Sequence, residues 1–203
     1  MIVADGEAAR TRAAQIISQG GVIAFRTDTF YGLGADPFNE AAIKRVRELK
    51  GREGNKPILL LISDEQQISR FISKQSSIFT EVAKRFWPGP LTIVGPAQDE
   101  LLNELTAGSR TIGLRLTGDE NARAIVRACG GALTATSANL SSQSEARSAS
   151  EVASYFATGI DLIIDGGEVS ATRPSTVIDL SGTEPRIVRE GVIKATELEK
   201  FLY

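Results

Sequence analysis

The chain has 203 residues, of which 42% are hydrophobic and 24% charged, and its formal net charge is −2. These values are ordinary for a globular protein, and the charge excludes a general electrostatic attraction to nucleic acid, so any basic surface has to be local. The absence of histidine excludes Ser-His-Asp and Cys-His nucleophile systems and zinc sites built on histidine. It favours chemistry driven by positioning and electrostatics, such as phosphoryl or nucleotidyl transfer.

The single cysteine, Cys129, excludes an intramolecular disulfide and is typical of a reducing compartment. The first residues show no leader-peptide pattern, and no apolar run is long enough to cross a bilayer. We therefore expect a cytoplasmic protein that does not act at a membrane.

Helical and strand patterns alternate along the first half of the chain. Apolar residues at helical spacing predict a helix over 7–18, and residues 22–25 form a short apolar run typical of a buried strand. A stretch rich in hydroxyls and glycines follows at 27–36, and Asn39 is a suitable N-cap for the next helix. The other elements expected here are a strand at 58–62, a helix at 77–86 ended by Trp87-Pro-Gly-Pro90, and a strand at 91–94.

The second half continues the alternation. The patterns predict strands at 111–116, 133–136, 162–164, 176–180 and 187–189, and helices at 121–128, after Ser148 and at 196–202. This mixture indicates an α/β (α+β) fold with mixed strand directions, and we expect a single domain over residues 1–203.

Three cations lie within seven residues, between the helix that follows Asn39 and the strand at 58–62. They are Lys50, Arg52 and Lys56, with glycines interleaved. A loose backbone with cationic side chains suits phosphate oxygens, which Arg can bind through two hydrogen bonds and Lys as a point charge. The alternative is that these cations only complement the dipole of the preceding helix.

The familiar nucleotide-binding motifs are missing. There is no G-x-x-x-x-G-K-[ST] and no G-x-S-x-G, and Gly32-Leu-Gly34 lacks the third glycine of the dinucleotide fingerprint. Carboxylates are not clustered at metal-ligand spacing, so we predict no metal site built by the protein itself. Phosphate, if bound, has to be held by a non-standard arrangement.

Three further groups of polar residues follow or interrupt the predicted strands, where α/β sheets usually place ligand sites. They are Thr27, Asp28, Thr29 and Tyr31; Ser137 and Asn139; and Arg115, Arg173 and Arg189. The first group is equally consistent with a hydroxyl-rich turn, and the second with a turn or helix cap. Arg115 interrupts an apolar strand and therefore needs a partner, either a ligand or an internal acidic side chain.

Seven blocks, in order over nearly the whole chain, resemble the signatures of the YrdC/TsaC family. They are Gly20–Gly34, Leu49-Lys-Gly-Arg52 with Lys56-Pro57, Trp87-Pro-Gly-Pro-Leu-Thr92, Thr111-Ile-Gly-Leu-Arg115, Thr136-Ser-Ala-Asn-Leu-Ser141, Ser175-Thr-Val-Ile-Asp179 and Ile187-Val-Arg-Glu-Gly191. The resemblance implies a twisted, open mixed sheet flanked by helices, with a positively charged concave face.

Members of that family are threonylcarbamoyl-AMP synthases, which are nucleotidyltransferases. The resemblance implies that L-threonine, bicarbonate or carbon dioxide, and ATP with Mg²⁺ yield threonylcarbamoyl-AMP and pyrophosphate. It also implies a partner transferase complex that places the threonylcarbamoyl group on tRNA.

The resemblance assigns roles to individual residues. Lys50 and Arg52 are the expected catalytic groups. The residues expected to contact ATP or its phosphates are Lys50, Arg52, Lys56, Thr111, Ser137, Asn139, Arg173 and Arg189. Thr29, Arg115 and the backbone at Ala135 are expected to hold L-threonine, with Arg115 on its carboxylate and Thr111 bounding the same pocket.

The chain departs from the family pattern in places. Many relatives have Asn-Pro where this chain has Lys56-Pro57, and a histidine where it has the apolar Leu61. The stretch 141–147 lacks the glycine and prolines common after S-A-N, and we assign no contacts to it. The length suggests the short, bacterial type of synthase, without an extra C-terminal domain.

Two other readings remain open. A cationic concavity could bind tRNA or double-stranded RNA through its backbone, without chemistry. The chain could also be a paralogue with another carbamoyl-adenylate reaction, such as the step in hydrogenase maturation.

Overall fold

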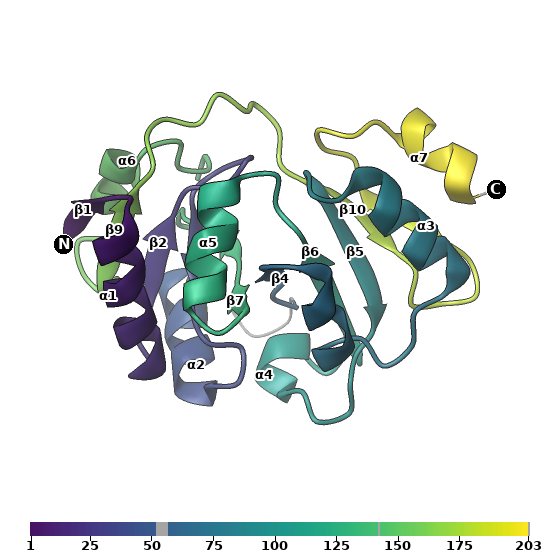
Figure 1. Cartoon of the computed structure of the whole chain (residues 1–203), viewed down its shortest axis with the longest axis horizontal. Helices are drawn as coiled ribbons and strands as arrows, with labels where there is room; N and C mark the ends of the chain where they lie inside the picture. The colour runs from purple at the N-terminus through teal and green to yellow at the C-terminus, as the bar shows by residue number, and fades with distance from the viewer. Residues whose placement is uncertain (52–56, 142, 203) are drawn as a thin grey trace.

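A computed structural model describes residues 1–51, 57–141 and 143–202 (Figure 1). Within these residues the strands form a five-stranded and a six-stranded sheet, each with parallel and antiparallel neighbours. The predicted α/β fold with mixed strand directions is confirmed, but the strands divide between two sheets instead of forming the one we expected. The extent of the domain, 1–203, stays a prediction.

The five-stranded sheet has a helix on each face. In spatial order it contains β1 (Ile2–Ala4), β9 (Leu162–Asp165), β2 (Ile23–Phe25), β3 (Gly32–Gly34) and β8 (Thr136–Ser137). Ile23 and Phe25 pack with α1 (Glu7–Ser18), whereas Ala24 packs with α6 (Ala149–Tyr155). Because side chains alternate along a strand, β2 is buried on both faces, which explains its continuous apolar run.

The six-stranded sheet has its helical core on one face. It contains β11 (Arg186–Arg189), β10 (Thr176–Asp179), β5 (Leu91–Pro96), β6 (Thr111–Arg115), β4 (Leu60–Ile62) and β7 (Ala132–Thr134). Leu91 and Ile93 of β5, with Ile112 and Leu114 of β6, pack into the same core as the helices. Those helices are α2 (Glu40–Leu49), α3 (Ser77–Phe86) and α7 (Ala195–Leu202); the last two lie on the right of Figure 1. The short elements η1 (Glu65–Arg70) and α4 (Asn103–Thr106) adjoin this core.

The two sheets adjoin along one extended segment, 132–137. Its first part is β7 of the six-stranded sheet and its last part is β8 of the five-stranded sheet. Between them, the Ala135 N–H donates to the Leu59 carbonyl at 2.8 Å. Helix α5 (Glu120–Ala128) covers the junction, because its Ile125 and Val126 share a core cluster with both α1 and β4. The two sheets therefore lie next to each other near Ala135.

The sequence patterns did not predict β1, β3 or α4, and there is a physical reason for each omission. β1 obtains its backbone partners from β9, about 160 residues later in the chain, and it is too short to show a period. In β3, a Cβ on Gly34 would lie 2.8 Å from the Phe25 ring, so this glycine permits close strand packing and does not mark a turn. Helix α4 has only four residues. Of the helices in the described ranges, none combines the length and apolar character that a membrane span requires.

Candidate functional site

A cleft of about 590 Å³ lies on the face of the six-stranded sheet that is opposite the helical core. Alternation along the strands sets its floor: Thr92 and Val94 of β5 and Thr111, Gly113 and Arg115 of β6 line it, while their neighbours point into the core. The facing wall comes from the side of the five-stranded sheet: residues 27 and 29–32, which run from the loop between β2 and β3 to the first residue of β3, and residues 135–137. The volume is in the range of small-molecule sites.

The cleft brings together predicted residues from separate parts of the sequence. Those lining it are Thr29, Thr111, Arg115, Ala135, Ser137 and Arg189. All but Ala135 belong to four of the seven sequence blocks. Their roles stay predictions, but their assembly in one cavity is a finding.

Arg115 is buried at the side of the cleft, with 5% of its surface exposed. Its Nη1 donates to the Thr29 hydroxyl at 3.0 Å, its Nε donates to the Gly89 carbonyl at 3.2 Å, and its Nη2 binds an Asp28 carboxylate oxygen. Burial lowers the pKa of Arg115, and Asp28 opposes that shift. The sequence left open whether the partner of Arg115 is a ligand or an internal acidic side chain. The structure provides the acidic partner, Asp28, and Arg115 also lines the cleft where a ligand could bind.

The segment 27–31 is the hydroxyl-rich turn that was one of its two readings. Thr27 Oγ1 donates to the Phe30 carbonyl at 2.7 Å and accepts the Thr29 N–H at 3.2 Å. Tyr31 donates its hydroxyl to the Gly167 carbonyl at 2.9 Å. Thr29 nevertheless lines the cleft beside Arg115, so the turn also supplies a hydroxyl to the site.

Lys50 follows α2 and is buried against the turn that contains Ser137 and Asn139. Its ammonium donates to the Ser137 carbonyl at 2.7 Å and to the carbonyl and side-chain oxygen of Asn139, both at 2.6 Å. The Ser141 hydroxyl donates to the Lys50 carbonyl at 2.6 Å. The cation therefore fixes the turn, and contact with a phosphate would require it to exchange one of these acceptors.

The remaining predicted cations lie in different surroundings. Arg189 lines the cleft and donates to the Ser175 carbonyl, with Nη2 at 2.9 Å; partial burial lowers its pKa, and the charge of Glu145 opposes the shift. Arg173 is half-exposed, 3.7 Å from Glu190, and is not among the residues that line the cleft. Arg52 and Lys56 lie outside the described residues.

The sequence identified Thr111 and Arg115 on the floor of the cleft but missed other lining residues, among them a hydroxyl pair and an acidic side chain. A buried hydroxyl pair, Thr92 and Ser175 at 3.1 Å, lines the floor, and Glu145 is the acidic side chain among the described lining residues. Hydroxyls inside otherwise apolar strands were the available signal for the floor; Glu145 lies in a loop with no pattern. In the described ranges, no group of three or more acidic or cysteine side chains could hold a metal ion.

The chain is similar to known proteins over most of its length. The family model for Sua5, YciO and YrdC proteins, described as telomere recombination, matches residues 15–191. A curated relative from Pyrococcus abyssi, named threonylcarbamoyl-AMP synthase, is 37% identical over 94% of this chain and 56% of its own length. A relative of the same name from Halorhodospira halophila is also 37% identical, over 82% of this chain and 87% of its own. The chain thus spans little more than half of the first relative and most of the second.

Solved structures extend the comparison. A crystal structure of P. abyssi Sua5 complexed with L-threonine superposes with a TM-score of 0.95 at 35% identity, over 100% of this chain and 61% of that one. E. coli YciO superposes with a TM-score of 0.87 at 26% identity, over 100% of this chain and 98% of its own. HypF in a phosphate- and nucleotide-bound form, at 14% identity and a TM-score of 0.78 over 90% of this chain and 29% of that one, shares the fold alone. On the match over residues 15–191, the chain belongs to the Sua5/YciO/YrdC family.

Proposed function

We propose that this protein is an L-threonylcarbamoyladenylate synthase, a nucleotidyltransferase that converts L-threonine, bicarbonate or carbon dioxide, and ATP into threonylcarbamoyl-AMP and pyrophosphate. The observation that carries the proposal is the cleft, in which a buried arginine beside a threonine hydroxyl and a second arginine line one cavity. The names of the relatives and the L-threonine complex of P. abyssi Sua5 support it.

The reaction needs alignment and charge neutralisation more than a nucleophile from the protein. The threonine amine captures carbon dioxide to form a carbamate, whose oxygen attacks the α-phosphorus of ATP while pyrophosphate leaves. Both reactants are anions, so cationic groups that hold them within reacting distance lower the barrier. A chain without histidine can supply this catalysis.

The cleft suggests how the residues divide the work. Arg115 holds the threonine carboxylate beside the Thr29 hydroxyl, and Thr111 and the Ala135 backbone bound the same pocket. The family resemblance assigns to the nucleotide and its phosphates a larger set, of which Thr111, Ser137 and Arg189 line the cleft: Lys50, Arg52, Lys56, Thr111, Ser137, Asn139, Arg173 and Arg189. Lys50 acts in part by holding Ser137 and Asn139 in place.

Mg²⁺ enters with ATP as part of that substrate. Magnesium is usually held by substrate phosphates, water and one or two carboxylates, and Glu145 is the carboxylate that the cleft offers for it. When bound, the ion neutralises charge on the phosphate oxygens.

The product is a reactive mixed anhydride and has to be passed on. We propose that a tRNA-modifying transferase complex in the cytoplasm receives the threonylcarbamoyl group. Direct contact with tRNA or double-stranded RNA is a subsidiary proposal that rests on local cations alone.

One incubation tests the reaction. The protein is mixed with L-threonine, bicarbonate, ATP and Mg²⁺, and the products are analysed by mass spectrometry and by a pyrophosphate assay. We expect threonylcarbamoyl-AMP and pyrophosphate in equal amounts, with neither formed when threonine or bicarbonate is omitted. Salt-sensitive RNA binding without any adenylate would favour the RNA-binding reading, and an adenylate made without threonine would favour the paralogue.

A further inference from the structure

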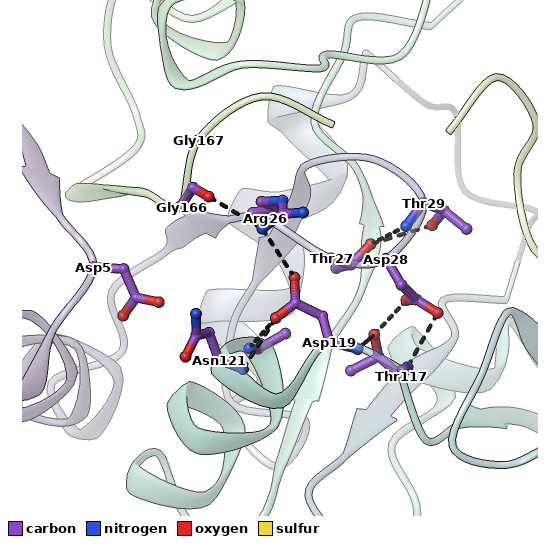
Figure 2. Close-up of polar contacts among 12 residues, drawn as sticks. Asp5, Arg26, Thr27, Asp28, Thr29, Thr117, Asp119, Asn121, Gly166 and Gly167 are labelled. Carbon is purple, nitrogen blue, oxygen red and sulfur yellow. Dashed lines mark hydrogen bonds and ion pairs between the residues drawn. The ribbon is translucent and has the colours of Figure 1, made fainter. Parts of the chain in front are cut away.

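Asp28 lies between two segments that are distant in sequence. Its Oδ1 accepts from Arg115 Nη2 and from the Thr117 hydroxyl, and its Oδ2 accepts the Gly118 N–H at 3.0 Å. Figure 2 shows the Asp28 carboxylate turned toward Thr117, beside the backbone that leads to Thr29. Both oxygens are therefore engaged, and the carboxylate has a single position relative to β6 and the loop that follows it.

These contacts fix the orientation of the Arg115 guanidinium. Three of its five N–H groups are donated inside the protein, to the Gly89 carbonyl, the Thr29 hydroxyl and Asp28. Within the described residues the other two N–H groups have no acceptor. A guanidinium binds a carboxylate through two parallel hydrogen bonds only if its plane is aligned with the ligand.

We propose that Asp28 is a positioning residue that orients Arg115 for the carboxylate of the amino-acid substrate. This inference rests on the proposed function and deepens it. Asp28 also compensates the charge of a guanidinium that is otherwise surrounded by neutral partners, Thr29 and Gly89. It contacts Arg115 and is not among the residues that line the cleft, so it acts through the arginine.

When Asp28 is neutralised, the proposal and a simple charge argument predict opposite changes in the affinity for L-threonine. If Arg115 acted only as a point charge, neutralising Asp28 would remove a competing anion and tighten the binding of a second carboxylate. If Arg115 acts through oriented hydrogen bonds, neutralising Asp28 releases the guanidinium and weakens that binding. Asp28→Asn removes the charge but keeps the shape of the side chain, so its effect on L-threonine affinity distinguishes the two models of Arg115.

A matched control, Asp119, lies in the loop that follows β6, which Asp28 contacts through Thr117 and Gly118. Asp119 accepts the N–H groups of Asn121 and Ala122 at 3.0 and 3.1 Å and lies 3.6 Å from Arg26. Figure 2 shows this carboxylate turned toward Arg26, away from Asp28. Asp119→Asn therefore removes a charge and perturbs the same loop without touching Arg115.

The test is a calorimetric titration of the full chain with L-threonine and with L-threoninol, which lacks the carboxylate, together with steady-state kinetics. For Asp28→Asn we expect L-threonine affinity to fall by about tenfold or more, with threoninol binding and the KM for ATP changed by less than about twofold. Asp119→Asn should behave as the wild type. Thr117→Val, which removes one donor to Asp28, should shift L-threonine affinity in the same direction by less, and it decides the question if Asp28→Asn does not fold.

Unchanged or tighter L-threonine binding in Asp28→Asn would overturn the inference, as would an equal loss for both ligands. A wild-type protein that neither binds L-threonine nor forms the adenylate would instead overturn the proposed function. The two failures are therefore distinguishable.

Discussion

Arg115 has its side chain on the cleft face of β6, while Ile112 and Leu114 of the same strand pack into the helical core. A buried cation is costly unless its charge and its N–H groups are matched, and Asp28, Thr29 and Gly89 match most of them. These contacts require hydrogen-bond donors in one plane, which the guanidinium of Arg115 provides and the ammonium of a lysine cannot.

Arg115→Lys should therefore be far from conservative. The lysine keeps the charge but loses the planar fork, so we expect kcat/KM for L-threonine to fall by about 30-fold or more, with the KM for ATP little changed. Steady-state kinetics with each substrate varied in turn provides the measurement. Equal activity of the two proteins would mean that only the charge at this position matters.

Arg52 lies outside the described residues, and its role comes from the family resemblance. If it clamps the triphosphate, Arg52→Ala removes about 2–4 kcal/mol of transition-state stabilisation, which corresponds to a loss of roughly 30- to 1,000-fold in rate. The fold should remain, as judged by an unchanged unfolding midpoint. Near-normal pyrophosphate release by this variant would refute the assignment.

At the scale of elements, Lys50 links the end of α2 to the turn at 137–139. Its ammonium is bonded to oxygens of Ser137 and Asn139, and its own carbonyl accepts the Ser141 hydroxyl. From the sequence, this lysine was expected to bind phosphate. The structure gives it a second task, because two segments about 90 residues apart are held by one cation.

Lys50→Met should thus lower stability as well as activity. Buried carbonyl oxygens that lose a charged donor cost about 1–3 kcal/mol, measurable as a lower urea midpoint. Lys44→Met is the control, because Lys44 lies in α2, is exposed and pairs with Glu40; the urea midpoint of this variant should match that of the wild type. A Lys50→Met protein of wild-type stability would show that the turn does not depend on this contact.

At the scale of the whole molecule, two sheets placed side by side create a cavity that neither forms alone. The floor comes from β5, β6 and β10, and the wall from the 27–32 segment and β8. The sheets meet along 132–137, through the packing of α5 and through the Arg115 contacts to Asp28 and Thr29, so ligand contacts on both sides of the cleft would add to the stability of the pair.

The free energy of unfolding should also decrease at alkaline pH. Burial raises the pKa of Cys129 from 9.0 to about 12, and burial with the nearby Asp165 charge raises the pKa of Tyr31 from 10.0 to about 12. Above about pH 9 the unfolded chain therefore releases protons that the folded chain retains, so the free energy of unfolding decreases as pH rises and is unaffected by these groups below about pH 8. Urea midpoints between about pH 7.5 and 10.5 measure the decline.

Cys129→Ala separates the two contributions. It should flatten the part of the decline that begins near pH 9 and leave the part due to Tyr31, which begins about one pH unit higher. A wild-type midpoint that stays constant to about pH 10.5 would contradict the assignment of both groups.

Local patterns in the sequence predicted the longer helices and indicated the family. α1, α2, α3 and α5 were found within a residue or two, because apolar periodicity and a capping side chain such as Asn39 act within one turn of helix. The sequence blocks that suggested the family are likewise each contiguous in the chain.

Only the tertiary structure decided which faces of β5 and β6 open onto the cleft, that β1 and β3 are strands, and that Asp28 holds Arg115. Each of these depends on hydrogen bonds or packing between segments that are not neighbours along the chain. Strand alternation tells which side chains share a face but not what covers that face, and so the cleft could not be placed before the two sheets were.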